Sequence, residues 1–197
     1  MATFVVPFHG AGGKSRLDSL GPDARSVLAR AMLTDVVDAC AQVGPTYVVG
    51  PVEPPFERAM ILEDPGAGQG AAVSFGLAMA CNEDRAGPFF VVNADLPCVT
   101  AADLRMLAAS LPRGGLAVVA ADDGTTNALG LSGAGRFRPL YGTGSAARFA
   151  ALEGARLVAI RNLVDDVDTL ADLERLEGRL GVHSAAALGG VRRMVAQ

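Results

Sequence analysis

The run Phe89-Phe90-Val91-Val92-Asn93-Ala94-Asp95-Leu96-Pro97 predicts a buried strand that ends in a polar turn. A succession of aromatic and β-branched side chains is typical of a strand whose two faces are both covered. The turn places Asp95 at the carboxyl end of this strand or just beyond it. Because ligands of open parallel sheets bind beyond that edge, we expect a functional site near Asp95.

Strand-like and helix-like segments alternate along the rest of the chain, which predicts one α/β domain over residues 1–197. We expect a mainly parallel sheet with helices on both faces. The expected strands are 3–8, 46–49, 60–62, 89–93, 116–121 and 157–160, and the expected helices are 22–43, 70–81, 100–110, 145–153 and 169–180. Residues 122–127 are expected to form a polar loop, 128–131 and 138–141 a hairpin-like pair, and 181–197 a tail that is either a last helix or partly irregular.

Composition excludes several classes of function. The net charge of −4 argues against a nucleic-acid-binding face. No apolar run approaches the roughly 20 residues that a membrane span requires. The segment 1–6 lacks basic residues and is typical of a strand rather than a signal peptide. Cys40, Cys81 and Cys98 are widely spaced, which favours reduced thiols in a cytoplasmic protein and argues against a zinc site.

Lys14 is the only lysine among 17 basic residues, and it lies in a glycine-rich loop after the first expected strand. Gly10, Gly12 and Gly13 would let the backbone come close to a ligand. A compact ammonium group suits phosphate oxygens. The alternative is a surface turn with a solvated lysine. We favour a phosphate-binding loop because every other basic position is arginine, although the loop matches neither the Walker nor the dinucleotide-binding pattern.

A second acidic group, Asp165-Asp166-Val167-Asp168-Thr169, precedes the late helix. If this backbone is extended, Asp166 and Asp168 point to the same side. Together with Asp95 they would form a three-carboxylate site for Mg²⁺, facing the phosphate-binding loop. Such a site suits phosphoryl-type transfer. The alternative is that Asp168 or Thr169 caps the helix while the other acids are solvated.

Two more polar segments are candidates for binding an anion: Gly124-Thr125-Thr126-Asn127-Ala128-Leu129 and Tyr141-Gly142-Thr143-Gly144-Ser145-Ala146-Ala147-Arg148. The second segment opens a helix, whose free N–H groups suit a phosphate or carboxylate. Arg148 lies three residues after Ser145, on the same helical face. The alternative is a serine-capped helix with a solvated arginine. His9 lies near the phosphate-binding loop, where it either contacts a ligand or only packs.

In this order the segments resemble the 2-phospho-L-lactate guanylyltransferase family of coenzyme F420 biosynthesis, whose bacterial members are associated with phosphoenolpyruvate. The Thr-Asn-Ala-Leu loop and the Gly-x-Gly-Ser-x-x-Arg segment carry most of the resemblance, since the Ala-Asp-Leu-Pro turn fits many nucleotidyltransferases. The matching stretches are Lys14-Ser15-Arg16-Leu17, Asn93-Ala94-Asp95-Leu96-Pro97, 124–129, 141–148 and Asp166-Val167-Asp168-Thr169.

The resemblance implies a Rossmann-like nucleotidyltransferase fold, Mg²⁺ as cofactor, GTP as donor and a small phospho-carboxylic acid as acceptor. It implies Asp95, Asp166 and Asp168 as metal ligands and Lys14 on the triphosphate. The residues expected to contact nucleotide are Gly10, Gly12, Gly13, Lys14, Gly70 and Asn93. Those expected to contact the acceptor are Thr125, Thr126, Asn127, Gly142, Ser145 and Arg148.

Several alternatives stay open at this point. The acceptor could be 2-phospho-L-lactate, phosphoenolpyruvate or 3-phosphoglycerate, and residues 68–72 lack the asparagine that the family tends to have at its base-binding turn. The same chemistry on a sugar phosphate or a molybdopterin is a rival interpretation, and so is a non-catalytic nucleotide-binding protein. The sequence also leaves open a homodimer and a downstream transferase that takes an unstable product.

Overall fold

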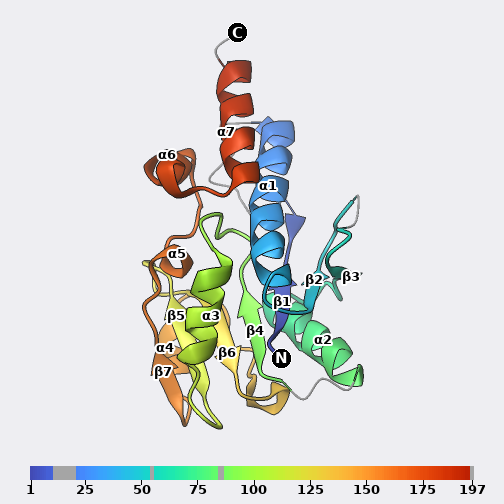
Figure 1. Ribbon diagram of the computed structural model, residues 1–197, viewed down its shortest axis with the longest axis vertical. Helices are drawn as coiled ribbons and strands as arrows, with labels where there is room; N and C mark the ends of the chain where they lie inside the picture. Colours follow the sequence, from blue (N-terminus) through green and yellow to red (C-terminus); the bar gives the residue numbers. More distant parts are fainter. Residues whose placement is uncertain (11–20, 54–55, 84–86, 196–197) are drawn as a thin grey trace.

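A seven-stranded sheet of order β3-β2-β1-β4-β6-β5-β7 forms the centre of the computed structural model, which describes residues 1–10, 21–53, 56–83 and 87–195 (Figure 1). The strands are β1 (Thr3–Pro7), β2 (Thr46–Val49), β3 (Met60–Leu62), β4 (Phe89–Val92), β5 (Leu116–Ala120), β6 (Thr126–Leu131) and β7 (Ala155–Leu157). The helices are α1 (Gly21–Ala41), α2 (Gln69–Asn82), α3 (Ala101–Ala109), α4 (Ser145–Ala150), α5 (Arg161–Val164), α6 (Leu170–Leu176) and α7 (Val182–Val195), with the 3-10 turns η3 (Ala134–Arg136) and η4 (Glu177–Arg179).

The sheet is mainly parallel, as predicted, but β6 runs antiparallel between β4 and β5. The expected pairing of 128–131 with 138–141 is wrong, because β6 pairs with β4 and β5 and residues 138–141 form no strand. The expected loop 122–127 is too long by two residues, since β6 begins at Thr126. The expected strand 157–160 is displaced toward the N-terminus: β7 ends at Leu157, and the unpredicted helix α5 follows.

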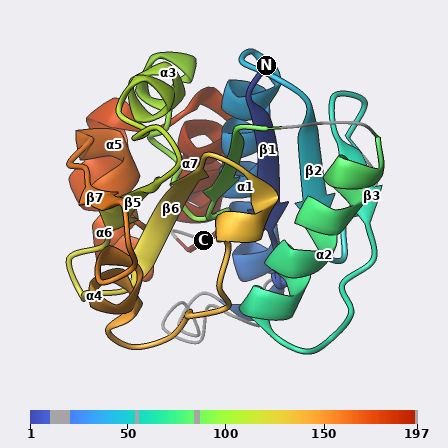
Figure 2. The same ribbon diagram turned by 90° about the horizontal axis from the view of Figure 1, so that it is seen from below.

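Alternate side chains of each strand enter different cores, as the two-residue period of a strand requires. Phe4 and Val6 of β1 pack with α1, α3 and α5 on one face, whereas Val5 packs with α2 and α4 on the other. In Figure 2, α3 and α4 lie on opposite sides of the β5–β6 pair. Both faces are therefore buried, which explains the long apolar runs in β1, β2 and β4.

A third apolar cluster lies where α6 and α7 pack on the N-terminal half of α1. In Figure 1, α7 stands beside α1, at the end of the molecule away from α2. Val167 belongs to this cluster and is fully buried. The tail that the sequence left open thus forms a helix over Val182–Val195. Within the described ranges, no helix is both long and apolar enough to cross a membrane.

Two helices near the site begin with capping boxes, Thr100 with Asp103 and Thr169 with Asp172. In the second box, Thr169 Oγ1 accepts the Asp172 amide at 3.2 Å, and Asp172 Oδ2 accepts the Thr169 amide at 2.9 Å. These bonds pair N–H groups that a helix N-terminus otherwise leaves without acceptors.

Thr169→Ala is expected to lower the free energy of unfolding by about 1 kcal/mol, because it removes the side-chain acceptor of this box. Denaturant unfolding followed by circular dichroism measures the change. Thr169→Ser keeps the hydroxyl and is the matched control, expected to stay within about 0.5 kcal/mol of the parent. Equal losses for the two variants would contradict the capping role.

Candidate active site

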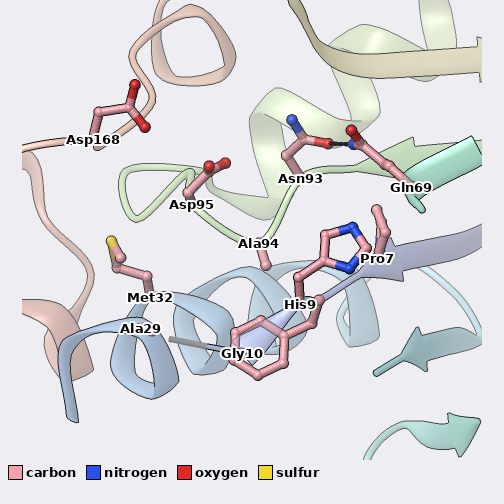
Figure 3. Close-up of a pocket in the computed structure, with 11 residues that line it drawn as sticks. Pro7, His9, Gly10, Ala29, Met32, Gln69, Asn93, Ala94, Asp95 and Asp168 are labelled. Atoms are coloured by element: carbon pink, nitrogen blue, oxygen red, sulfur yellow. Dashed lines mark hydrogen bonds between the residues drawn. The ribbon is translucent and has the colours of Figure 1, made fainter. Parts of the chain in front are cut away.

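A cavity of about 170 Å³ opens at the carboxyl ends of β1 and β4. Figure 3 shows Asp95 and Asp168 at one side of it and His9, Asn93 and Gln69 at the other, with Gln69 hydrogen-bonded to Asn93. The apolar part of the wall comes from Ala29 and Met32 of α1. The full lining is Pro7, Phe8, His9, Gly10, Ala29, Met32, Gln69, Asn93, Ala94, Asp95 and Asp168.

Three carboxylates converge beside this cavity. One oxygen from each of Asp95, Asp166 and Asp168 lies within 4.8 Å of the other two, and all three side chains are partly exposed. Between the last two, Val167 points into the third cluster, and its amide donates to the Asp95 carbonyl oxygen at 3.0 Å. Asp166 and Asp168 thus lie together while Val167 is buried elsewhere, as expected from the Asp-Val-Asp alternation, and the main-chain bond joins this segment to the turn after β4.

The electrostatics of this carboxylate cluster favour a cation. Burial raises the pKa of Asp166 to about 6, and the negative charge of Asp95 adds to the rise, while a hydrogen bond from Asn127 opposes it. Carboxylates that share a site repel one another unless a proton or a cation lies between them. Three oxygen donors that are partly exposed, and so leave room for water, fit the preferences of Mg²⁺. The roles of these residues as metal ligands stay predictions.

An amide network supports the floor of the site. Gln69 Nε2 donates to Asn93 Oδ1 at 2.8 Å, and Asn93 Nδ2 donates to the Thr126 carbonyl oxygen at 3.1 Å. Asn127 is buried, and its amide donates to the Val164 carbonyl oxygen at 2.9 Å and to Asp166 Oδ1 at 3.4 Å. Asn127 is predicted from the family resemblance to contact the acceptor substrate. In this structure its side chain orients Asp166, a predicted metal ligand.

The residues predicted to contact the acceptor substrate differ in their exposure to solvent. The hydroxyls of Thr126 and Ser145 lie 2.9 Å apart in a buried pair, so they face each other and not the solvent. Gly142 is exposed and lines a second cavity, between the start of α2 and residues 139–142. Thr125 is half-buried and donates its hydroxyl to Asp123 at 2.7 Å.

Arg148 binds the loop that precedes its own helix. Its guanidinium donates to the carbonyl oxygens of Leu140 at 2.9 Å, Tyr141 at 3.2 Å and Thr143 at 2.6 Å. In this structure Arg148 therefore fixes the loop that carries Gly142. Whether the side chain also contacts an acceptor stays a prediction.

The predicted nucleotide-binding residues are only partly described. Gly12, Gly13 and Lys14 lie outside the described residues, whereas Gly10 and Asn93 line the cavity. Gly70 lines the second cavity. Contacts of these residues with nucleotide stay predictions.

Sequence reasoning missed one polar residue of the site, Gln69, and left the role of a second, His9, open. Gln69 lines both cavities, and its position next to Gly70 at the start of a helix was the only available signal. His9 Nδ1 lies 3.2 Å from Asp64 Oδ2 and so joins the loop after β1 to the loop before α2. No local pattern connects two residues that are 55 positions apart.

Comparison with known proteins identifies the family of this chain. Residues 11–184 match the MobA-like NTP transferase domain family. A phosphoenolpyruvate guanylyltransferase from Sphaerobacter thermophilus is 33% identical over 94% of this chain and 97% of its own length. A 2-phospho-L-lactate guanylyltransferase from Natronomonas pharaonis is 33% identical over 86% of this chain and 81% of its own length.

The chain belongs to the phosphoenolpyruvate and 2-phospho-L-lactate guanylyltransferase family. The resemblance predicted from the sequence motifs is thus confirmed. This member of the guanylyltransferase family also shares its fold with 2-C-methyl-D-erythritol 4-phosphate cytidylyltransferase from Thermus thermophilus, at a TM-score of 0.56 and 21% identity over 95% of this chain and 99% of that one. The expected Rossmann-like nucleotidyltransferase fold is confirmed as well.

Proposed function

We propose that this chain is a Mg²⁺-dependent guanylyltransferase that joins GMP from GTP to the phosphate of a small phospho-carboxylic acid, in coenzyme F420 biosynthesis. The observation that carries the proposal is the convergence of Asp95, Asp166 and Asp168 beside the cavity at the carboxyl ends of β1 and β4. Carboxylates in this position would hold a divalent cation, which would supply charge neutralisation to phosphate groups. Family membership supplies the class of donor and acceptor.

In this reaction a phosphate oxygen of the acceptor attacks the α-phosphorus of GTP, and the bond from that phosphorus to the β-phosphate bridging oxygen breaks. Pyrophosphate leaves with the electron pair. A phosphate monoester is already nucleophilic, so the protein mainly positions the reactants and neutralises charge. When bound, Mg²⁺ would supply charge neutralisation at the reacting phosphates.

The residues have separate roles in this proposal. Asp95, Asp166 and Asp168 would hold the cation, and Lys14 would neutralise the departing pyrophosphate. The loop that Arg148 fixes carries Gly142, which lines the second cavity and would contact the acceptor substrate. The buried hydrogen bond between Thr126 and Ser145 holds the end of that loop against the sheet, since it joins β6 to the first residue of α4.

The proposal predicts pyrophosphate release that requires GTP, Mg²⁺ and one acid together. The assay offers 2-phospho-L-lactate, phosphoenolpyruvate and 3-phosphoglycerate in parallel, with ATP and CTP as donor controls. We expect release with GTP and at least one of these acids, and a loss of release when EDTA removes the metal. Release that proceeds equally well with CTP would contradict the guanylyl assignment. Binding of GTP without release, across the whole panel, would favour a non-catalytic nucleotide-binding protein.

A further inference from the structure

A chain of hydrogen bonds and ion pairs links α3, α5, η4 and α6, the elements that follow the two carboxylate-bearing loops. It begins at the cap of α3, where Asp103 Oδ2 accepts the Thr100 amide at 2.9 Å and the Thr100 hydroxyl at 2.6 Å. The same oxygen accepts Asn162 Nδ2 at 3.0 Å. The cap of α3 is therefore joined to α5, although the two residues are 59 positions apart.

The other end of the Asn162 side chain continues the network. Asn162 Oδ1 accepts Arg179 Nη1 at 3.0 Å, and Arg179 Nη2 lies 2.5 Å from Asp165 Oδ2. The second oxygen of Asp165 pairs with Arg175 Nη1 at 2.9 Å, and Arg175 Nη2 reaches Asp172 at 3.3 Å. Asp172 belongs to the capping box of α6, so the network ends at a second helix cap.

The two caps belong to the two loops that carry the carboxylate cluster. The loop that contains Asp95 leads into α3, and the loop that contains Asp166 and Asp168 leads into α6. Asp165, the residue next to Asp166, is itself held by two arginines. Its side chain is only 15% exposed, so these ion pairs are less screened than those of a fully solvated carboxylate. The network therefore connects the two loops whose relative position determines the distances among Asp95, Asp166 and Asp168.

We propose that Asn162 is a positioning residue that sets the separation of Asp95 from Asp166 and Asp168, and through it the affinity of the site for a divalent cation. This inference rests on the proposed metal site. Asparagine suits the position because it faces a carboxylate, which can only accept, and a guanidinium, which can only donate. Aspartate would place an oxygen against Asp103, and an aliphatic residue would leave both neighbours without this partner.

Asn162→Asp is the sharpest test, because it is isosteric and keeps an acceptor for Arg179 while it replaces the donor to Asp103 by a repelling oxygen. Mn²⁺ binding to the nucleotide-free, full-length protein, followed by electron paramagnetic resonance of the free ion, measures the site without reference to activity. We expect binding weaker by about 10-fold, the lower end of what removal of an outer-shell partner costs. Turnover at saturating Mn²⁺ should change less than the half-saturating Mn²⁺ concentration.

The matched control is Asn82→Asp, at the exposed C-terminal end of α2, which should bind Mn²⁺ within about twofold of the parent. Asn162→Ala removes both bonds without adding a charge and serves if the aspartate variant does not fold. A residue that only stabilises the fold would lower the melting temperature and leave Mn²⁺ affinity unchanged in the folded protein.

Asp168→Asn separates failure of this inference from failure of the metal site. If Asp168→Asn weakens Mn²⁺ binding and both Asn162 variants bind as the parent does, the positioning role is wrong. If Asp168→Asn and the parent bind Mn²⁺ equally, the proposed metal site is wrong, and the inference about Asn162 falls with it.

Discussion

Asp168→Asn is expected to lower the turnover number of guanylyl transfer by more than about 100-fold, because a lost ligand should cost more than a lost outer-shell partner. Asp168 lies at the cavity, and one of its oxygens is within 4.8 Å of oxygens of Asp95 and Asp166. The asparagine keeps the size of the side chain and removes its negative charge. Pyrophosphate release at saturating GTP and acid measures the effect.

Asp38→Asn is the matched control for this change. Asp38 lies on α1, its side chain is 41% exposed, and it pairs with His183. We expect turnover within about twofold of the parent, since exposed ion pairs contribute little. Turnover of Asp168→Asn as high as that of this control would eliminate the metal role, whereas a loss that higher Mg²⁺ concentrations partly restore would support it.

The site was predictable where a local pattern encodes it. The alternation of Asp166, Val167 and Asp168 assigns the two acids to one side of an extended backbone, because successive side chains of such a backbone point in opposite directions. The buried Val167 is the physical reason that this geometry holds. Likewise, the apolar run of β4 determines where Asp95 emerges, since a strand buried on both faces can change to polar residues only at its end.

Prediction failed where pairing over long range decides the structure. Thr126 and Asn127 are polar and lie in a Gly-Thr-Thr-Asn context, which favours a loop, but β4 and β5 flank them and make them the first residues of a strand. Residues 138–141 have apolar character without strand partners, because Arg148 binds the carbonyl oxygens of Leu140 and Tyr141 that a sheet would otherwise use.

The C-terminal helix α7 also depends on a contact that local sequence does not predict, because a side chain of another helix caps its N-terminus. Asp35 of α1 is buried, and its carboxylate accepts the amide of His183 at 3.1 Å and that of Ser184 at 2.9 Å. Gly181 comes close enough that a Cβ there would overlap the Asp35 carboxylate. Nothing in the residues around Val182 indicates this acceptor, which lies nearly 150 positions earlier.

Asp35→Ala is therefore expected to lower the free energy of unfolding by about 2–5 kcal/mol, since it leaves two N–H groups at the start of α7 without their acceptor in a buried place. For a chain of 197 residues this corresponds to a fall in melting temperature of roughly 4–20 °C. Differential scanning calorimetry measures the fall.

Asp38→Ala, one turn along the same helix, removes only an exposed contact with His183 at 3.2 Å and should lower the free energy of unfolding by less than about 1 kcal/mol. Similar losses in the two variants would show that general charge effects, and not the cap, hold α7 against α1. A loss confined to Asp35→Ala would instead show that the carboxylate anchors α7, and with it the apolar cluster that buries Val167, between Asp166 and Asp168.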